Sequence, residues 1–307
     1  MITVSLLGYA VANNFISMVL LRVFHGLGSV FFWVSALTFS SLTASGMKRD
    51  EVIRKYTLAV AMGMMSGPVI STFCIFALSM RDTFIFASTL ACLSMIPAIF
   101  LVRKTPFKPA DFLRRKQSFV IPGRVLSNRV FQSNLFAYFA VSFAFGVMLT
   151  YAPIYAREAF SFADEQVTLL FFGYYLAMTG VRFGIGEFIK LLGKSMISAL
   201  GLFGAVCMLW IMSISSLPAF FATAFCLYGL SMGVVFPIGA MRIADTLNRS
   251  DLVLANSFYL LGWDLGCTLA PILLSFVAVQ LGIPYALATS AILPLSAILI
   301  MTYRANS

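Results

Sequence analysis

A pattern of glycine, tyrosine and proline residues inside apolar segments occurs twice in this sequence, 203 positions apart. The first copy lies within residues 20–68, and one offset holds across two apolar segments and the loop between them. Constant register of this kind is typical of a duplicated helical unit. The matched pairs are Gly26 and Gly229, Leu27 and Leu230, Thr43 and Thr246, Tyr56 and Tyr259, Leu58 and Leu261, Gly63 and Gly266, and Pro68 and Pro271. The duplication predicts two related helical bundles.

The apolar content places these bundles in a lipid bilayer. Of the 307 residues, 61% are hydrophobic and only 10% are charged. A helix needs about 20 apolar residues to cross the hydrocarbon, where the backbone must satisfy its own hydrogen bonds. We therefore predict an all-α integral membrane protein without a sheet. The five cysteines lie in apolar runs without metal-ligand spacing, so we expect no metal site and no cofactor.

Hydropathy divides the chain into about ten membrane spans. We interpret residues 1–102 as part of an N-terminal half-bundle with four helices, and residues 130–307 as a C-terminal half-bundle with six. Residues 103–129 form a basic cytoplasmic linker whose prolines stop helices. The expected spans cover residues 1–12, 15–41, a third span ending at 79, 83–102, 130–155, 166–188, 195–214, 218–241, 253–280 and 284–303.

The basic residues predict the orientation of the spans. Seventeen of the 21 lysines and arginines fall in loops and ends that share one face of the membrane. Cytoplasmic loops carry such an excess of positive charge. We therefore expect a multi-pass protein of the plasma membrane with a cytoplasmic C-terminus. The net charge of +10 follows from these loops, so we expect no nucleic-acid partner.

The first two spans after the linker have no counterpart in the first half, because the offset maps residues 130–188 to positions before Met1. A complete first half would need about 70 further residues, enough for two helices. We therefore expect an N-terminally truncated form of a twelve-helix protein. Both a misplaced start and a real truncation fit this expectation.

The stretch LLRVFHGLG places Arg22, Gly26 and Gly28 in the second span, with His25 between them. This pattern resembles the fourth-helix motif of the major facilitator superfamily, in which glutamine often stands at the position of His25. The expected six-plus-six bundle with a basic linker is similar to that family as well. The resemblance covers the family's third to twelfth helices. It implies a secondary transporter that works by alternating access and has no enzymatic activity.

The stretch GMMSGP in the third span resembles the family's fifth-helix motif, which is associated with antiporters. The matching residues are Gly63, Gly67 and Pro68, whereas Ser71 and Thr72 replace the last two glycines of the motif. The resemblance implies antiport, and therefore export of the solute.

A third resemblance concerns the family's loop motif, of which a copy normally occurs in each half. The matching residues in the second half are Gly186, Gly193 and Lys194, with Arg182 ahead of them and Lys190 where the family has aspartate. We expect these residues to form a cytoplasmic gate. Arg182 is expected near the cytoplasmic end of its span, where charges cost little.

Small residues recur every four positions in the third span, and its repeat has a similar stripe. Such stripes allow helix backbones to approach closely, and proline within a helix bends it. We expect this set, together with Gly26, to form a sealing contact between the halves; tight packing alone is the alternative. The stripes and their prolines are Ala59, Gly63, Gly67, Ser71 and Pro68 in the first copy, and Gly262, Gly266, Ala270 and Pro271 in the second.

Three polar residues inside spans are the candidate substrate or proton-coupling residues. Arg22 lies roughly 12 Å into its span, where a charge costs on the order of 3 kcal/mol. It would bind an anionic group or tune an acid; snorkelling to the interface is the alternative. His25 shares its helix face and is either titratable or a packing residue. Asp264, the acid deepest in a span, is either a proton or cation site or a structural hydrogen-bonding residue.

The function predicted from these features is proton-coupled export of a small molecule by a monomer in the lipid bilayer. Uptake or facilitated diffusion of a metabolite is one alternative, and a non-transporting remnant is another. An intramembrane enzyme is disfavoured, because the chain has one histidine and lacks DDxxD, HExxH and GxSxG motifs. We therefore expect no catalytic residues.

Overall fold

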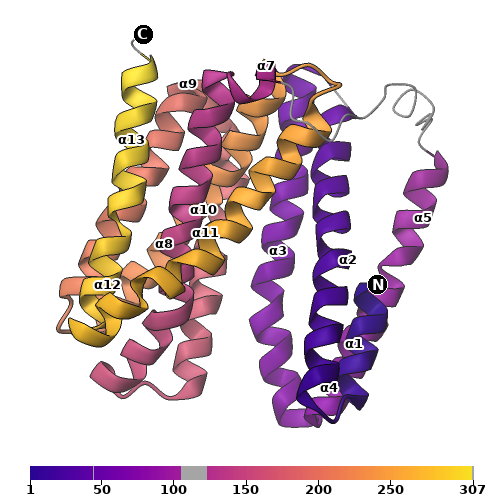
Figure 1. Cartoon of the computed structure of the whole chain (residues 1–307), viewed down its shortest axis with the longest axis vertical. Helices are drawn as coiled ribbons and strands as arrows, with labels where there is room; N and C mark the ends of the chain where they lie inside the picture. Colours follow the sequence, from indigo (N-terminus) through magenta and orange to yellow (C-terminus); the bar gives the residue numbers. More distant parts are fainter. Residues whose placement is uncertain (44, 105–122, 306–307) are drawn as a thin grey trace. The chain divides into compact units, whose positions relative to one another are not determined.

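The computed structural model describes residues 1–43, 45–104 and 123–305, and these residues are almost entirely helical (Figure 1). Most of the expected linker, residues 103–129, lies outside the described part. The helices are α1 (Ile2–Val11), α2 (Phe15–Leu42), α3 (Met47–Ala77), α4 (Met80–Leu93), α5 (Met95–Lys104), α7 (Gly123–Leu126), α8 (Arg129–Phe160), α9 (Asp164–Ile214), α10 (Pro218–Thr246), α11 (Leu252–Gln280), α12 (Ile283–Ser290) and α13 (Ile292–Ala305). The all-α prediction is confirmed.

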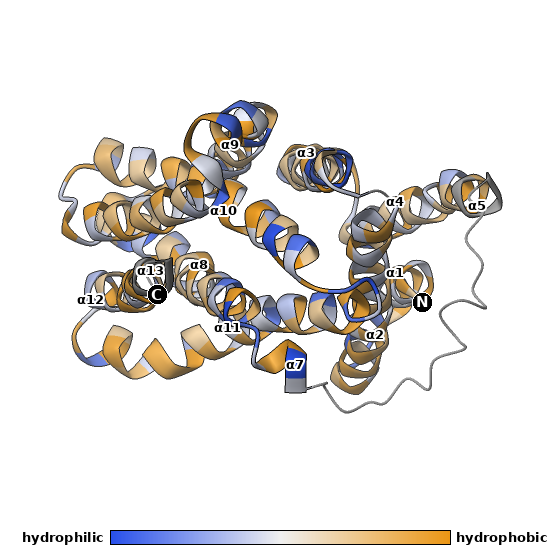
Figure 2. Cartoon of the chain, turned by 90° about the horizontal axis from the view of Figure 1, so that it is seen from above, coloured by the Kyte–Doolittle hydropathy of each residue, from blue (hydrophilic) through white to orange (hydrophobic). Residues whose placement is uncertain are grey.

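Eight stretches of the described residues are long and apolar enough to cross a membrane. One of them, α9, has 51 residues and would be about 76 Å long if straight, which is enough for two crossings. Its helical geometry breaks at Gly193, whose φ of 77° favours glycine, so α9 contains both spans expected on either side of that residue. Figure 2 shows the prevailing apolar colouring of the ribbon, interrupted by hydrophilic residues, for example on α3 and α7.

The chain divides into two compact units whose boundaries cut through α2 and α3. The first contains Met1–Ala36 and Val69–Ile121, and the second contains Leu37–Pro68 and Pro122–Ser307. The second unit therefore combines parts of α2 and α3 with all helices from α7 onward. Division into half-bundles at residues 102 and 130 stays a prediction.

In the first unit, α1 packs on α4 and on the first half of α2. The hydroxyl of Ser88 donates to the carbonyl of Thr3 at 3.0 Å, and the ring of Tyr9 lies 5.4 Å from that of Phe84. A Cβ on Gly28 would lie 2.9 Å from the Cβ of Met1, so α1 and α2 touch where α2 has no side chain.

In the second unit, two helix pairs pack with their backbones in contact. On α11, a Cβ at Gly266 would lie 2.8 Å from both the carbonyl oxygen of Phe139 and the amide nitrogen of Phe143 on α8. On α10, a Cβ at Gly233 would lie 2.7 Å from the carbonyl oxygen of Met178 on α9. Only glycine fits so close an approach. These contacts hold α8 to α11 and α9 to α10.

The two copies of the small-residue stripe have different surroundings. Gly262 and Gly266 pack against α8, a helix of the same half of the sequence. A Cβ on Gly63 or Gly67 would meet no atom of the described residues within 4 Å. The second-half stripe thus packs tightly inside its own half, and a sealing role for either stripe stays a prediction.

This difference predicts unequal effects of the same substitution at repeat-related positions. Gly266→Ala should lower the free energy of unfolding by about 1–3 kcal/mol, because the new methyl group overlaps backbone atoms of α8. Gly63→Ala is the matched control and should leave stability nearly unchanged. Thermal unfolding of both variants in detergent measures the difference. Equal melting temperatures would contradict the close α8–α11 contact.

Candidate functional site

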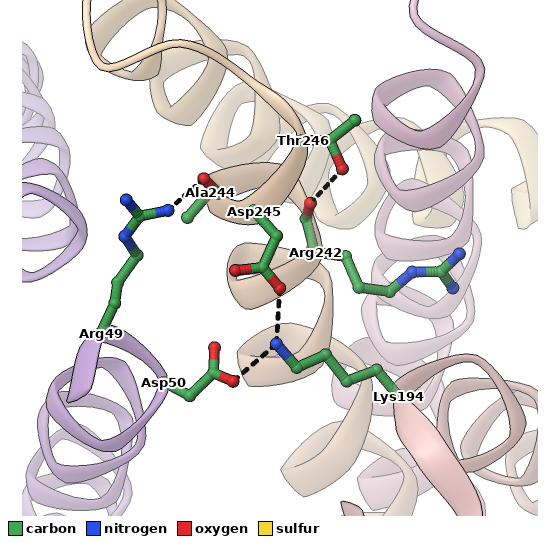
Figure 3. Close-up of polar contacts among 7 residues, drawn as sticks. All are labelled: Arg49, Asp50, Lys194, Arg242, Ala244, Asp245 and Thr246. Carbon is green, nitrogen blue, oxygen red and sulfur yellow. Dashed lines mark hydrogen bonds and ion pairs between the residues drawn. The ribbon is translucent and has the colours of Figure 1, made fainter. Parts of the chain in front are cut away.

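A lysine shared by two carboxylates joins α3, α9 and α10. The Nζ of Lys194 lies 2.6 Å from the carboxylate of Asp50 and 2.6 Å from that of Asp245 (Figure 3). The three side chains are 19%, 25% and 39% exposed, respectively. The ammonium group has three donors, so one lysine can hold both carboxylates at once.

The sequence explains why these charges meet at one end of the bundle. Lys194 directly follows the break at Gly193, where α9 reverses. Asp50 lies in the first turn of α3, where a negative charge is favourable. Asp245 lies in the last turn of α10, where a negative charge is unfavourable, so it benefits from the cation of Lys194.

Two arginines lie beside this cluster and differ in orientation. Arg49 on α3 donates to the backbone carbonyl of Ala244 on α10 (Figure 3). This places a cation at the C-terminal end of α10, where exposed carbonyls attract it. The guanidinium of Arg242 points away from Lys194 and lies 3.4 Å from the hydroxyl of Ser195.

Arg182 lies deeper in the same unit and is 3% exposed. Its Nε donates to the carbonyl of Gly233 at 3.1 Å, and a terminal nitrogen lies 3.4 Å from the carbonyl of Met232. Pro237 explains the first bond: proline has no N–H, so the carbonyl four residues earlier, that of Gly233, lacks its helical donor. Arg182 supplies the missing donor.

The third bond of Arg182 reaches the first half of the sequence. Its other terminal nitrogen donates to the backbone carbonyl of Thr57 on α3. The guanidinium also lies 5.8 Å from the ring centre of Phe236. Among the described residues, no carboxylate lies within ion-pair distance of Arg182. The hydrogen-bond partners of this buried cation among the described residues are thus backbone carbonyls, and an aromatic ring lies beside it.

A third link joins α11 to α2. The amide nitrogen of Asn256 lies 3.3 Å from the hydroxyl of Thr38 and 3.4 Å from that of Ser41. All three residues are buried. The links at Lys194, Arg182 and Asn256 therefore connect α2 and α3 to α9, α10 and α11 through polar bonds, which we call the polar gate.

A stack of aromatic rings leads away from Arg182. The ring of Tyr138 lies 5.2 Å from Phe236, 4.4 Å from Tyr259 and 5.6 Å from Trp263. The hydroxyl of Tyr259 lies 3.1 Å from the carbonyl of Phe236, which fixes that ring. Trp263 is partly exposed, so the stack connects the buried guanidinium with the surface of the unit.

The candidate residues Arg22 and His25 lie in one unit, and Asp264 lies in the other. Arg22 and His25 belong to the first unit, where the ring of His25 stacks on Tyr9 at 6.0 Å. Arg22 is exposed and interacts electrostatically with His25. Asp264 belongs to the second unit, is exposed next to Trp263, and makes no hydrogen bond or ion pair with the described residues. Their roles stay predictions.

An ion pair outside the spans attaches the short helix α7. Arg124 lies 2.7 Å from Asp251, the residue before α11, and this carboxylate raises the pKa of Arg124 above its ordinary value. The pair holds the described end of the linker region to the second unit.

Comparison with known proteins identifies the family. A model of the Major Facilitator Superfamily matches residues 1–195 and 135–306. The chain belongs to the major facilitator superfamily. It is therefore a multi-pass membrane protein of a solute-transporter family rather than an enzyme, as the motifs predicted. No curated protein sequence matches the chain.

Solved transporter structures share the fold. The human organic anion transporter MFSD10 (TETRAN) superposes with a TM-score of 0.80 at 17% identity, over 98% of this chain and 74% of its own. The E. coli fucose:proton symporter FucP superposes with a TM-score of 0.73 at 16% identity, over 99% of this chain and 83% of its own. At such identities the likeness concerns the fold.

The sequence prediction for this superfamily member included two residues of the polar gate, Lys194 and Arg182. The sequence predicts Arg182 near the cytoplasmic end of its span, where charges cost little. In the structure it lies eleven positions before Gly193 and is buried. Hydropathy alone does not show the carbonyl acceptors that make this burial tolerable. The partners Asp50, Asp245, Thr57 and Asn256 were not predicted, because their roles depend on helices far apart in the sequence.

The shared lysine predicts how the gate responds to its removal. Lys194→Met removes the ammonium group that Asp50 and Asp245 share, so the N-terminal turns of α3 should open more often. We expect backbone amides of residues 47–57 to exchange with deuterium about fivefold faster, which corresponds to roughly 1 kcal/mol. Hydrogen–deuterium exchange in nanodiscs measures this.

The matched control is Lys190→Met, because among the described residues Lys190 pairs only with Glu187 on its own helix, and its side chain is 72% exposed. Its exchange rates at residues 47–57 should match those of the unmodified protein. Equal rates in all three proteins would show that Lys194 does not hold α3.

Proposed function

We propose that this superfamily member is a proton-coupled exporter of a small molecule that works by alternating access, and that the polar gate closes its cytoplasmic end. The observation that carries the proposal is that side chains of α9 and α11 bind α2 and α3, which belong to the other half of the sequence. Bonds between halves at one end of a bundle must break when that end opens.

The strength of the polar gate fits a reversible closure. Lys194 and its two carboxylates are partly exposed, and such ion pairs contribute about 0–1 kcal/mol each. Two conformations that differ by a few kcal/mol are both accessible, and a ligand can shift their populations. The ion pairs of Lys194 therefore close this end of the protein without trapping it.

The excess of basic residues in the loops supports the cytoplasmic assignment of this end and of the C-terminus. Arg49 and Lys194 at the gate are part of that excess. The plasma membrane as location, a monomeric state and a role of Gly26, Gly63, Gly67, Gly262, Gly266, Pro68 and Pro271 in the motion of the helices belong to the same proposal.

Asp264 is the proposed proton carrier. It lies in the middle of α11 without a cationic partner among the described residues, and it is exposed. A carboxyl group in a membrane span that can reach water and has no fixed ion pair can take up and release a proton during transport. His25 beside Arg22 is a second candidate of the same kind in the first unit.

Substitution of Asp264 tests the coupling. Proteoliposomes loaded with a pH-sensitive dye are screened with a library of small metabolites, and we expect compounds that enter to drive protons in the opposite direction. Asp264→Asn should reduce this proton movement at least about tenfold while compounds still move down their own gradients, because the amide cannot bind the proton. Glu158→Gln, at an exposed acid near the end of α8, is the control.

Each other outcome favours a different function. Unchanged proton movement in Asp264→Asn would exclude this residue as the carrier and direct attention to His25. If the unmodified protein transports solute equally fast with and without a pH gradient, the function would be facilitated diffusion. Protons and solute moving in the same direction would mean uptake. No flux of any compound would support a non-transporting protein.

A further inference from the structure

We propose that Arg182 is the anion-binding residue of a substrate site for flat, apolar acids, and that α3 covers this residue while the polar gate is closed. The inference rests on the alternating access proposed above. It adds the chemical class of the substrate and the residue that recognises it.

The hydrogen bond from Arg182 to Gly233 does not require a charged side chain. The orphaned carbonyl of Gly233 needs one donor, which a neutral glutamine or asparagine could supply. An arginine instead brings a permanent positive charge into a nearly dry site, where an uncompensated charge is costly. Because no described carboxylate pairs with it, the compensating anion is missing from the protein itself.

The guanidinium also has unused donors. It carries five N–H groups, and three carbonyl acceptors are bound to it in this conformation. Two of these acceptors, Gly233 and Met232, lie on α10, the helix packed against α9. The third, Thr57, lies on α3 and leaves when α3 separates. The terminal nitrogen that held Thr57 is then free, and the other keeps one N–H beyond its bond to Met232. Each terminal nitrogen can therefore donate to one oxygen of a carboxylate.

The surroundings of Arg182 specify the rest of the ligand. Phe236 lies beneath the guanidinium, and Tyr138 and Trp263 continue the stack toward the surface of the unit. Stacked rings favour another flat ring by apolar burial and by offset stacking. A cationic solute would be repelled by the unpaired guanidinium. The site therefore selects an acid with an aromatic or similarly flat body.

The same bond couples substrate to gate. The carbonyl of Thr57 and the carboxylate of a bound acid compete for the same terminal nitrogen of Arg182. The acid therefore binds better to the conformation in which α3 has moved away, and it shifts the population toward that conformation. Binding of an anion at Arg182 therefore favours the open conformation of the polar gate.

The test compares acids with amides of the same shape. Purified full-length protein in detergent is given benzoate or benzamide, indole-3-acetate or indole-3-acetamide, and 2-naphthoate or 2-naphthamide, and thermal unfolding is measured. We expect the acids to raise the melting temperature and the amides to leave it unchanged. Deuterium exchange at residues 47–57 should become faster with acids, because the bond to Thr57 is lost.

Three variants identify the residue. Arg182→Gln keeps a donor for Gly233 and should abolish the acid effect, whereas Arg182→Lys keeps the charge without the fork and should retain a weaker one. Arg242→Gln, at a partly buried arginine that points away from the gate, should behave like the unmodified protein. If Arg182→Gln does not fold, the comparison of acids with amides and the Arg182→Lys variant still show whether Arg182 binds the acid.

Equal shifts from acids and amides, no shift from either, or an acid effect that persists in Arg182→Gln would each overturn the inference. These measurements use no gradient and no transport. Acid binding that depends on Arg182 would stand even if Asp264→Asn left proton movement unchanged, and proton-coupled export of neutral or cationic solutes would refute the anion site while leaving the proposed function intact.

Discussion

The hydrocarbon of a membrane offers no hydrogen bonds, and this constraint explains both the regular and the irregular parts of the structure. Regular helices satisfy their own backbone groups. Where proline removes a donor, another group must replace it or the carbonyl stays unpaired. At Pro237 the replacement comes from Arg182, a side chain of the neighbouring helix. The lack of hydrogen bonds in the hydrocarbon thereby explains why a side chain of α9 donates to the backbone of α10 at this place.

Close packing then fixes where that cation lies. Glycines on α10 let the backbone of α9 come close, and glycines on α11 do the same for α8. In each case the neighbouring backbone occupies the space that a Cβ atom on the glycine would need. Such contacts between backbones leave little freedom for one helix to slide along the other. Arg182 on α9 and its acceptors on α10 therefore move together, and the bond from Arg182 to Thr57 on α3 is the one that a separating motion would break.

The links between the sequence halves differ in kind from the packing within the second half. They consist of a shared lysine, a guanidinium on a carbonyl, and an amide near two hydroxyls. Bonds of this kind are replaced by water without leaving a cavity, whereas a glycine–backbone contact has no such substitute. The contrast fits the proposed function, in which the interface between the sequence halves opens while the pairs of helices stay packed.

The sequence by itself determined the all-α membrane class, the approximate positions of the membrane-spanning helices and the resemblance to the superfamily. Apolar runs, the excess of basic residues and the three motifs are local patterns, and each follows from a solvent or backbone requirement that acts on neighbouring residues. The same local information pointed to Lys194 and Arg182, since a glycine at a helix break and a charge in an apolar run are visible in the chain itself.

Only the tertiary structure decided what these residues touch. Asp50 and Asp245 are 195 positions apart, and Thr57 and Arg182 are 125 apart, so no periodicity relates them. The stripes at Gly63 and Gly266 are alike in sequence, yet only the second meets a helix in the described residues. Hydropathy shows how much apolar surface a helix has. Which face of the helix contacts a neighbour depends on how all the helices pack together.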